Sequence, residues 1–237
     1  MESFRTFMER ISSFELPVMS LDKNFMPAKS LHAKTESDGS FKRFYGDTIV
    51  FDLEDSEKSL INSTVKVLYD EVPECFCERL DKNTFHMTLH DLSNSSNFNQ
   101  ISRNMQENKF KLESLLESNT IGLHKIKMKS KAIFNMVNTS LVLGLYPESE
   151  NDYIMLMNLY SIADEIMKLP YTLTPHITLA YYNPDGFGSD SAERLENTVN
   201  RLNTENYEFV LNTERLFYQH FTSMNEYENI ICLKNGV

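Results

Sequence analysis

The stretches Phe85-His86-Met87-Thr88-Leu89 and Pro175-His176-Ile177-Thr178-Leu179 indicate the fold of this chain more directly than any other part of it. Both read His-x-Thr-Leu with an apolar residue at x, and they lie in opposite halves of the sequence. The chain has only 6 histidines, so two occurrences of one pattern by coincidence would be rare. The repeat predicts two related halves, each of which brings a histidine to a shared cleft.

Side chains in a strand alternate between two faces, and this alternation gives the first copy a chemical face. We expect Met87 to point into a core, while His86 and Thr88 point the other way. An imidazole and a hydroxyl two residues apart lie about 6.5–7 Å from each other along the strand, which suits two groups that contact one phosphate. His90 falls on the same face and could line the groove, although a histidine satisfied by hydrogen bonds is the default interpretation.

The second copy repeats this arrangement. Ile177 is expected in the core, and His176 and Thr178 share the opposite face. Continued alternation places Tyr182 on the histidine face, where its ring could stack on a base, and Tyr181 on the core side. Packing in the core or at the rim is at least as good an interpretation for both tyrosines.

Two imidazoles and two hydroxyls around one anion provide the groups that phosphoester hydrolysis needs. One imidazole can accept a proton from the attacking hydroxyl or water while the other donates one to the leaving oxygen, since histidine titrates near pH ~6.5. The threonine hydroxyls can donate hydrogen bonds to the phosphate oxygens and stabilise the transition state. This arrangement requires no metal ion and no cofactor.

The order of the expected elements supports a repeat, because each motif strand lies between two helices. Apolar residues at helical spacing indicate the helices, alternation indicates the strands, and Pro73 and Pro170 end two of the helices. The expected elements are helix 3–14, strand 48–53, helix 56–71, strand 84–92, a loop at 93–97, helix 100–118, strands 121–134 and 139–146, helix 151–169, strand 174–182, helix 190–203, and strands 207–221 and 227–234.

The two motifs and this order of elements resemble the 2H phosphoesterase superfamily, which includes LigT-like RNA 2′,3′-cyclic phosphodiesterases and related proteins called 2′-5′ RNA ligases. The resemblance implies an α+β, bilobal fold in which two pseudo-twofold-related antiparallel sheets with outer helices surround a central groove. It also implies a metal-independent reaction at a cyclic or other nucleotide-linked phosphodiester. On that pattern His86 and His176 would act as acid and base. Thr88 and Thr178 would hold the phosphate.

The stretch Tyr45-Gly46-Asp47-Thr48-Ile49-Val50 is similar to a less characterised branch of that superfamily, in which a Gly-x-Thr strand precedes the first motif. Tyr45 is a further candidate for lining the groove, with core packing as the alternative. The expected core is about residues 46–237, whereas residues 1–45 form an N-terminal arm with no assigned counterpart. We therefore expect one bilobal domain over residues 1–237.

The composition restricts the partners. With a formal net charge of −11 the chain has no long-range attraction for a phosphate backbone, so we expect a small nucleotide or an RNA end and no long nucleic acid. No apolar stretch approaches the ~20 residues of a membrane span, and the start lacks the pattern of a signal peptide. Cys75, Cys77 and Cys232 favour free thiols in a cytoplasmic protein over a disulfide framework or a zinc site. We expect a monomer.

A run of lysines could form a local basic surface despite the negative net charge. Lys125, Lys127, Lys129 and Lys131 alternate along one expected strand. A solvated strand edge is the default interpretation of such a run, and a local phosphate-binding stripe is the alternative.

The sequence favours a metal-independent phosphodiesterase that opens a cyclic phosphate or cleaves a short oligonucleotide. Two alternatives stay open. The protein could bind a nucleotide or an RNA end without catalysis, with the N-terminal arm covering the groove, or it could ligate RNA ends. The base, the linkage and the assignment of acid and base to particular histidines do not follow from the sequence.

Overall fold

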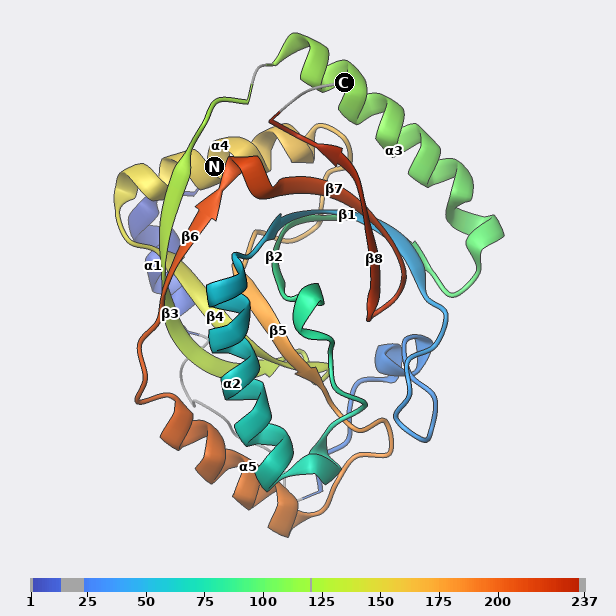
Figure 1. The fold of residues 1–237 in the computed structure, drawn as a ribbon, viewed down its shortest axis with the longest axis vertical. Helices are drawn as coiled ribbons and strands as arrows, with labels where there is room; N and C mark the ends of the chain where they lie inside the picture. Colours follow the sequence, from blue (N-terminus) through green and yellow to red (C-terminus); the bar gives the residue numbers. More distant parts are fainter. Residues whose placement is uncertain (1, 14–23, 120, 235–237) are drawn as a thin grey trace.

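A computed structural model of the chain describes residues 2–13, 24–119 and 121–234 (Figure 1). The last residue of the expected helix 3–14 lies outside these ranges. The helices are α1 (Phe4–Ser13), α2 (Asp55–Glu71), α3 (Phe98–Ser118), α4 (Glu150–Asp164) and α5 (Ser189–Leu202). The strands are β1 (Tyr45–Asp52), β2 (His86–Ser95), β3 (Lys125–Met136), β4 (Ser140–Pro147), β5 (His176–Tyr181), β6 (Glu208–Asn212), β7 (Leu216–Ser223) and β8 (Glu226–Cys232).

The strands form one curled antiparallel sheet in the order β6-β3-β4-β5-β2-β1-β7-β8. Each motif strand lies at the middle of the sheet, where β2 and β5 meet through the pairing of Met87 with Ile177. Four strands lie on either side of this junction, and the sheet curls so far that β6 contacts β1 (Figure 1). The α+β class is confirmed, with one difference from the expectation: the two halves are joined in a single sheet.

The two halves repeat one order of elements. The chain runs β1–α2–β2–α3–β3 and then β4–α4–β5–α5–β6, before β7 and β8 complete the half that contains the first motif. Helix α3 packs against β1 and β2, α4 packs against β2, β3 and β4, and α2 and α5 pack against each other. This repeat places the motif strands β2 and β5 in corresponding positions.

Helix α2 shows how local sequence and packing agree. It begins with a capping box in which the Glu54 side chain accepts from the backbone of Glu57 while the Glu57 side chain accepts from the backbone of Glu54. Ile61, Val65 and Leu68 follow at helical spacing and are fully buried. Truncating Ile61 or Leu68 to alanine would cost about 2–5 kcal/mol, because a core cavity would remain.

A buried carboxylate fastens α3 to the sheet. Asp47 accepts hydrogen bonds from the Ser93 backbone N–H at 2.7 Å, from Asn108 Nδ2 of α3 at 3.0 Å and from the Tyr218 hydroxyl at 2.9 Å. Burial raises the pKa of Asp47, and the hydrogen bonds from Asn108 and Ser93 oppose that shift. The odd-numbered residues at the start of β1 therefore face α3.

Two expectations about the strands are wrong. The expected strand 207–221 is two strands at different places in the sheet, because the 3₁₀ turn Thr213–Arg215 separates β6 from β7 and the Asn212 side chain caps that turn. The expected loop at 93–97 is in part strand, since β2 continues to Ser95 alongside β1. In both cases long-range pairing decides the local structure.

At Phe25 the N-terminal arm lies against the second half of the chain. Phe25 exchanges backbone hydrogen bonds with Phe187, and their rings stack with centroids 4.7 Å apart. Further along, Thr35 pairs with Phe41 in a short bridge and is fully buried. The arm is thus part of the packed structure at both places. Within the described ranges, no helix combines the length and the apolar character needed to cross a membrane.

The attachment of the arm can be tested at Gly186. This residue has φ +73°, and a Cβ added there would lie 2.2 Å from the carbonyl oxygen of Phe25. We expect Gly186→Ala to lower the free energy of unfolding in urea by about 1–3 kcal/mol, from the left-handed backbone and the contact together. Gly188→Ser is the matched control, because Gly188 caps α5 and has open space around it. Equal stability of the two variants would contradict the described position of the arm.

Candidate active site

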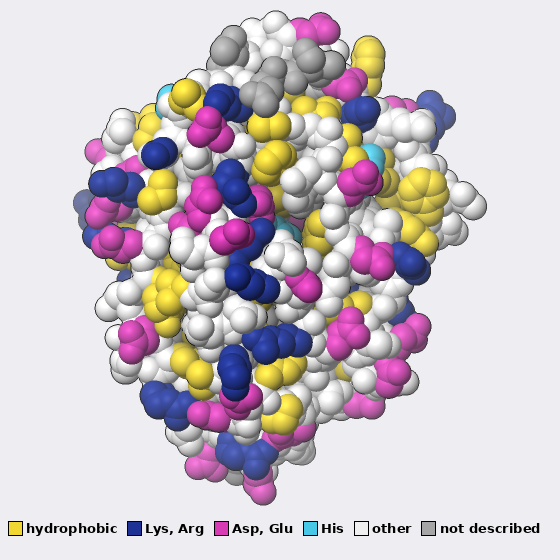
Figure 2. All heavy atoms as spheres, in the orientation of Figure 1, with side chains coloured by type: hydrophobic (Ala, Val, Ile, Leu, Met, Phe, Trp, Pro, Cys, Tyr) yellow, Lys and Arg dark blue, Asp and Glu magenta, His cyan; other side chains and the backbone are white. Residues whose placement is uncertain are grey.

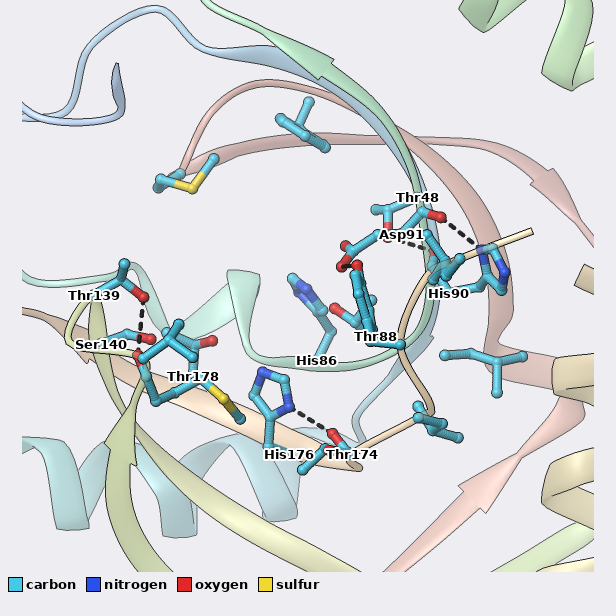
Figure 3. Close-up of a pocket in the computed structure, with 18 of the residues that line it drawn as sticks. Thr48, His86, Thr88, His90, Asp91, Thr139, Ser140, Thr174, His176 and Thr178 are labelled. Atoms are coloured by element: carbon cyan, nitrogen blue, oxygen red, sulfur yellow. Dashed lines mark hydrogen bonds between the residues drawn. The ribbon is translucent and has the colours of Figure 1, made fainter. Parts of the chain in front are cut away.

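A cavity of about 610 Å³ lies over the junction of the two halves, and both motifs line it (Figure 3). His86, Thr88, His176 and Thr178 all contribute to its wall, and each of these side chains is partly exposed. The structure therefore brings together all four residues that the motifs indicate. Residues from the N-terminal arm, from β1, from the turn between β3 and β4, from β7 and β8 and from the loop before β5 also line the cavity.

The two histidines are held in the same way. His86 Nδ1 lies 2.6 Å from the backbone oxygen of Thr84, and His176 Nδ1 lies 2.7 Å from the backbone oxygen of Thr174 (Figure 3 draws the second bond). A carbonyl oxygen can only accept, so Nδ1 carries the hydrogen in both rings. Nε2 is then the nitrogen that can accept a proton, or donate one once the ring is charged.

Both supporting carbonyls are themselves anchored. Thr84 ends the 3₁₀ turn Lys82–Thr84, which the Asp81 side chain caps, and the Thr84 hydroxyl donates to the Asp81 backbone oxygen at 2.7 Å. The Thr174 hydroxyl accepts from Arg10 of α1 at 3.2 Å. The orientation of each ring is thus determined by residues just before the strand.

Antiparallel pairing sets the mutual placement of the four side chains. Because Met87 pairs with Ile177, position 86 lies opposite 178 and position 88 lies opposite 176. The two histidines then occupy diagonal positions, for which Cα separations are about 7–8 Å. In Figure 3 the two rings lie next to each other on the floor of the cavity.

A β-bulge lies at the leucine that ends each motif. In the first half Val50 pairs with Thr88 and Ile49 pairs with His90, so Leu89 has no partner on β1. In the second half Val142 pairs with Thr178 and Leu141 pairs with Ala180, which leaves Leu179 as the extra residue. Both leucines are buried. The leucine shared by the two copies thus has a structural role, and the bulge shifts the alternation of side chains beyond it.

Burial is the main influence on the titration of the two rings. It lowers the pKa of both histidines from the ordinary value of 6.5. The hydrogen bonds to the carbonyls of Thr84 and Thr174 oppose this shift. The positive charge that His176 can carry lowers the pKa of His86 further, which is consistent with two rings close enough to interact.

The surroundings of the two rings differ behind the cavity. Asp52 of β1 pairs with His86, and its charge favours the protonated form of that ring. Asp52 is also in an ion pair with Lys58, 2.5 Å away, and in another with Arg215. Gly144 occupies the corresponding position opposite His176. His86 and His176 therefore have the same local geometry but different electrostatic surroundings.

The aromatic wall includes residues that the sequence pattern missed. The Tyr227 ring of β8 meets the His86 ring edge-on, with centroids 5.1 Å apart. Tyr181 also lines the cavity, although alternation predicted it on the core side. The bulge at Leu179 explains this difference, because it turns residue 181 to the face that 178 occupies.

Two of the further candidates do not line the cavity. Tyr182 is fully buried, and its ring packs on Phe25 with centroids 4.6 Å apart. The expected groove-lining position of Tyr182 is therefore wrong. The bulge at Leu179 is again the cause, because it turns residue 182 away from the cavity. Tyr45, the other candidate for lining the groove, does not line the cavity either. Its ring contacts Phe98 of α3 at 5.4 Å, since it shares the face of Asp47.

His90 lines the cavity but is buried and satisfied. Its Nδ1 lies 2.6 Å from the Asp91 backbone oxygen and its Nε2 lies 3.4 Å from Asp164 Oδ1. The default interpretation of this residue thus agrees with the structure. Asp91, the residue after His90, is exposed, whereas His90 is buried. The Asp91 carboxylate accepts a hydrogen bond from the Tyr171 hydroxyl at 3.0 Å.

The lysine run and the cysteines are not part of the cavity. Lys127 and Lys129 form ion pairs with Glu148, and β3 has a partner strand on both sides, so the run lies on a solvated face of an interior strand. Burial raises the pKa of the Cys75 and Cys77 thiols to about 12. Among the described residues, no group of three or more histidine, cysteine, aspartate or glutamate side chains could hold a metal ion.

Comparison with known proteins gives a likeness in structure. No protein-family model and no curated protein matches the sequence. The structure is similar to that of a conserved protein of unknown function, ATU0111, from Agrobacterium tumefaciens, with 16% identity over 88% of this chain and 94% of that chain and a TM-score of 0.66. The solved structures that it resembles also include E. coli LigT complexed with 3′-AMP, with 15% identity over 80% of this chain and 95% of that chain and a TM-score of 0.47. Another is TT0787 of Thermus thermophilus, with 11% identity over 78% of this chain and 94% of that chain and a TM-score of 0.48. The chain thus shares its fold with ATU0111.

The lowered histidine pKa values lead to a testable pH dependence. We expect the ring C–H resonances of His86 and His176 to titrate below 6.5 in the free protein, and inorganic phosphate to raise both midpoints, because an anion favours the charged rings. At these two residues the unfolded chain binds more protons than the folded chain just below pH 6.5, so their contribution to the free energy of unfolding should fall as the pH falls through that range.

His124 is the control for this titration, because it is exposed and lies outside the cavity. Its resonance should not respond to phosphate. If the His86 and His176 midpoints are equally unresponsive, the two rings do not share an anion site.

Proposed function

We propose that this chain is a phosphoesterase of the 2H type, which hydrolyses a cyclic phosphate or a short oligonucleotide phosphodiester without a metal ion. The observation that carries the proposal is the matched support of His86 and His176. Each ring donates Nδ1–H to the carbonyl two residues earlier and keeps Nε2 available in one cavity. A purely structural histidine would not need that duplication at the two corresponding positions of the fold.

The reaction follows from the states of the two rings. Burial keeps both imidazoles neutral at neutral pH, and a bound phosphate anion stabilises a proton on one of them. The neutral ring then takes a proton from water as the new P–O bond forms. The charged ring gives its proton to the ribose oxygen as the bond between phosphorus and that oxygen breaks. The sum of the two transfers leaves the enzyme with the protons with which it began.

The threonine hydroxyls complete the site in this proposal. Thr88 and Thr178 lie opposite His176 and His86 across the junction, so a phosphate between the rings is within reach of both hydroxyls. Hydrogen bonds from them strengthen as negative charge develops on the non-bridging oxygens. This role requires neither a cofactor nor a basic surface.

The substrate in this proposal is a small nucleotide or the end of an RNA. The formal net charge is −11, and on the face drawn in Figure 2 the Lys and Arg side chains lie among Asp and Glu side chains. A long nucleic acid would meet repulsion at such a surface. We also propose that residues 1–237 act as one bilobal domain, since the cavity takes residues from both halves and from the arm.

Substitution of the histidines tests the proposal. We expect His86→Ala and His176→Ala each to lower turnover of nucleoside 2′,3′-cyclic phosphates by about 10²–10⁴, because each removes a proton-transfer group. Thr88→Ala and Thr178→Ala should each lower it by about 10²-fold. Circular dichroism and urea unfolding would verify the fold of each variant. His124→Ala is the matched control and should retain the wild-type rate. Wild-type turnover in either histidine variant would exclude the proposed pair.

A second measurement concerns the metal. The proposed reaction moves protons between histidines and water only, so exhaustive treatment with EDTA should leave the rate unchanged. Loss of turnover that returns on addition of a divalent cation would contradict the metal-independent proposal.

A further inference from the structure

The two ends of the cavity have opposite electrostatic character. Tyr181 follows Thr178 along β5, and Asp91 follows Thr88 along β2. Because these strands are antiparallel, residues 181 and 91 lie at opposite ends of the cavity, roughly 20 Å apart along the strands. Figure 3 shows Thr139 and Ser140 toward one end and Asp91 toward the other, with the two histidines between them.

Lys34 is the basic side chain of this cavity. Among the described residues that line it, no other lysine and no arginine is present. The Lys34 ammonium lies 5.3 Å from the centroid of the Tyr181 ring and 5.4 Å from that of Phe44. These cation–π contacts hold the ammonium in place without neutralising its charge. Within the described parts of the chain, no carboxylate forms an ion pair with it, whereas Lys127 pairs with Glu148 and Arg201 pairs with Glu71.

Backbone hydrogen bonds and a buried neighbour fix the position of Lys34 in the N-terminal arm. Its backbone N–H donates to the Leu31 oxygen at 2.8 Å at the end of the 3₁₀ turn Lys29–Ala33. The next residue, Thr35, is fully buried, and its hydroxyl donates to the same Leu31 oxygen at 3.1 Å. An ammonium that is fixed, half-buried and free of an acidic partner in a cavity is suited to bind an anion.

We propose that the Lys34 end of the cavity binds a second anionic group of the substrate, a phosphate attached about one nucleotide away from the phosphate between the histidines. This inference rests on the proposed function for the identity of the first phosphate. The Asp91 end accepts an uncharged group that donates hydrogen bonds, because its carboxylate repels anions. The substrate class is therefore a nucleoside cyclic phosphate that carries a further phosphate on the side of Lys34.

The test compares two pairs of nucleotides. Turnover is measured for adenosine 2′,3′-cyclic phosphate and for the same compound with a 5′-phosphate. Binding is measured by calorimetry for adenosine 2′-monophosphate and for adenosine 2′,5′-bisphosphate. We expect the additional phosphate to raise kcat/KM and the affinity by at least about tenfold in the wild type, as a charge-assisted hydrogen bond would.

Lys34→Met should reduce both ratios to near one, and Lys34→Arg should retain part of the preference. Lys29→Met is the matched control, since Lys29 is an exposed lysine of the same arm outside the cavity, and it should keep both ratios. Equal handling of the two members of each pair by the wild type, or an unchanged preference in Lys34→Met, would overturn the inference.

The two proposals fail in different ways. A preference for the bisphosphate in binding, lost in Lys34→Met, without turnover of either cyclic phosphate would support the second anion site and contradict the phosphoesterase. Turnover of both cyclic phosphates at equal rates would support the phosphoesterase and contradict the second anion site. Absence of both binding and turnover would contradict both.

Discussion

The pairing of Met87 with Ile177 is the contact on which the candidate site depends. It joins β2 to β5 and so makes one sheet from two four-stranded halves. Both side chains are fully buried, and the residues on either side of each must therefore face the cavity. A slip of the register by one residue would turn the motif side chains into the core, which makes any other register costly.

The repetition of the fold extends to details of the backbone. Each motif begins with a histidine bonded to the carbonyl two residues earlier and ends at a leucine in a bulge. The bulge lets the strand bury two residues in succession, and it directs the third residue after each threonine back to the cavity. At that point the halves differ, since one presents Asp91 and the other Tyr181. The same scaffold thus yields a symmetric centre with unlike ends.

The motifs, the helices and most of the strands could be predicted from the sequence because they depend on local pattern, whereas the division between β6 and β7 depends on long-range pairing. His86 and His176 share a cavity as alternation and repetition indicate. The bulges could not be predicted, since Leu89 and Leu179 fit regular alternation equally well. For this reason the sequence placed Tyr182 in the groove and Tyr181 in the core, whereas the structure has them the other way round. Lys34 could not be found either, because the arm has no motif and reaches the cavity only through tertiary packing.

In the reaction that we propose, two imidazoles from distant parts of the sequence act on one phosphate. The most direct measurement is a crystal structure of the protein with adenosine 2′-monophosphate or vanadate. The proposed histidine pair requires the anion to lie between the rings, with Nε2 of His86 and of His176 each within about 3.2 Å of one of its oxygens. An anion bound elsewhere in the cavity, with the two Nε2 atoms separated by protein side chains, would contradict it.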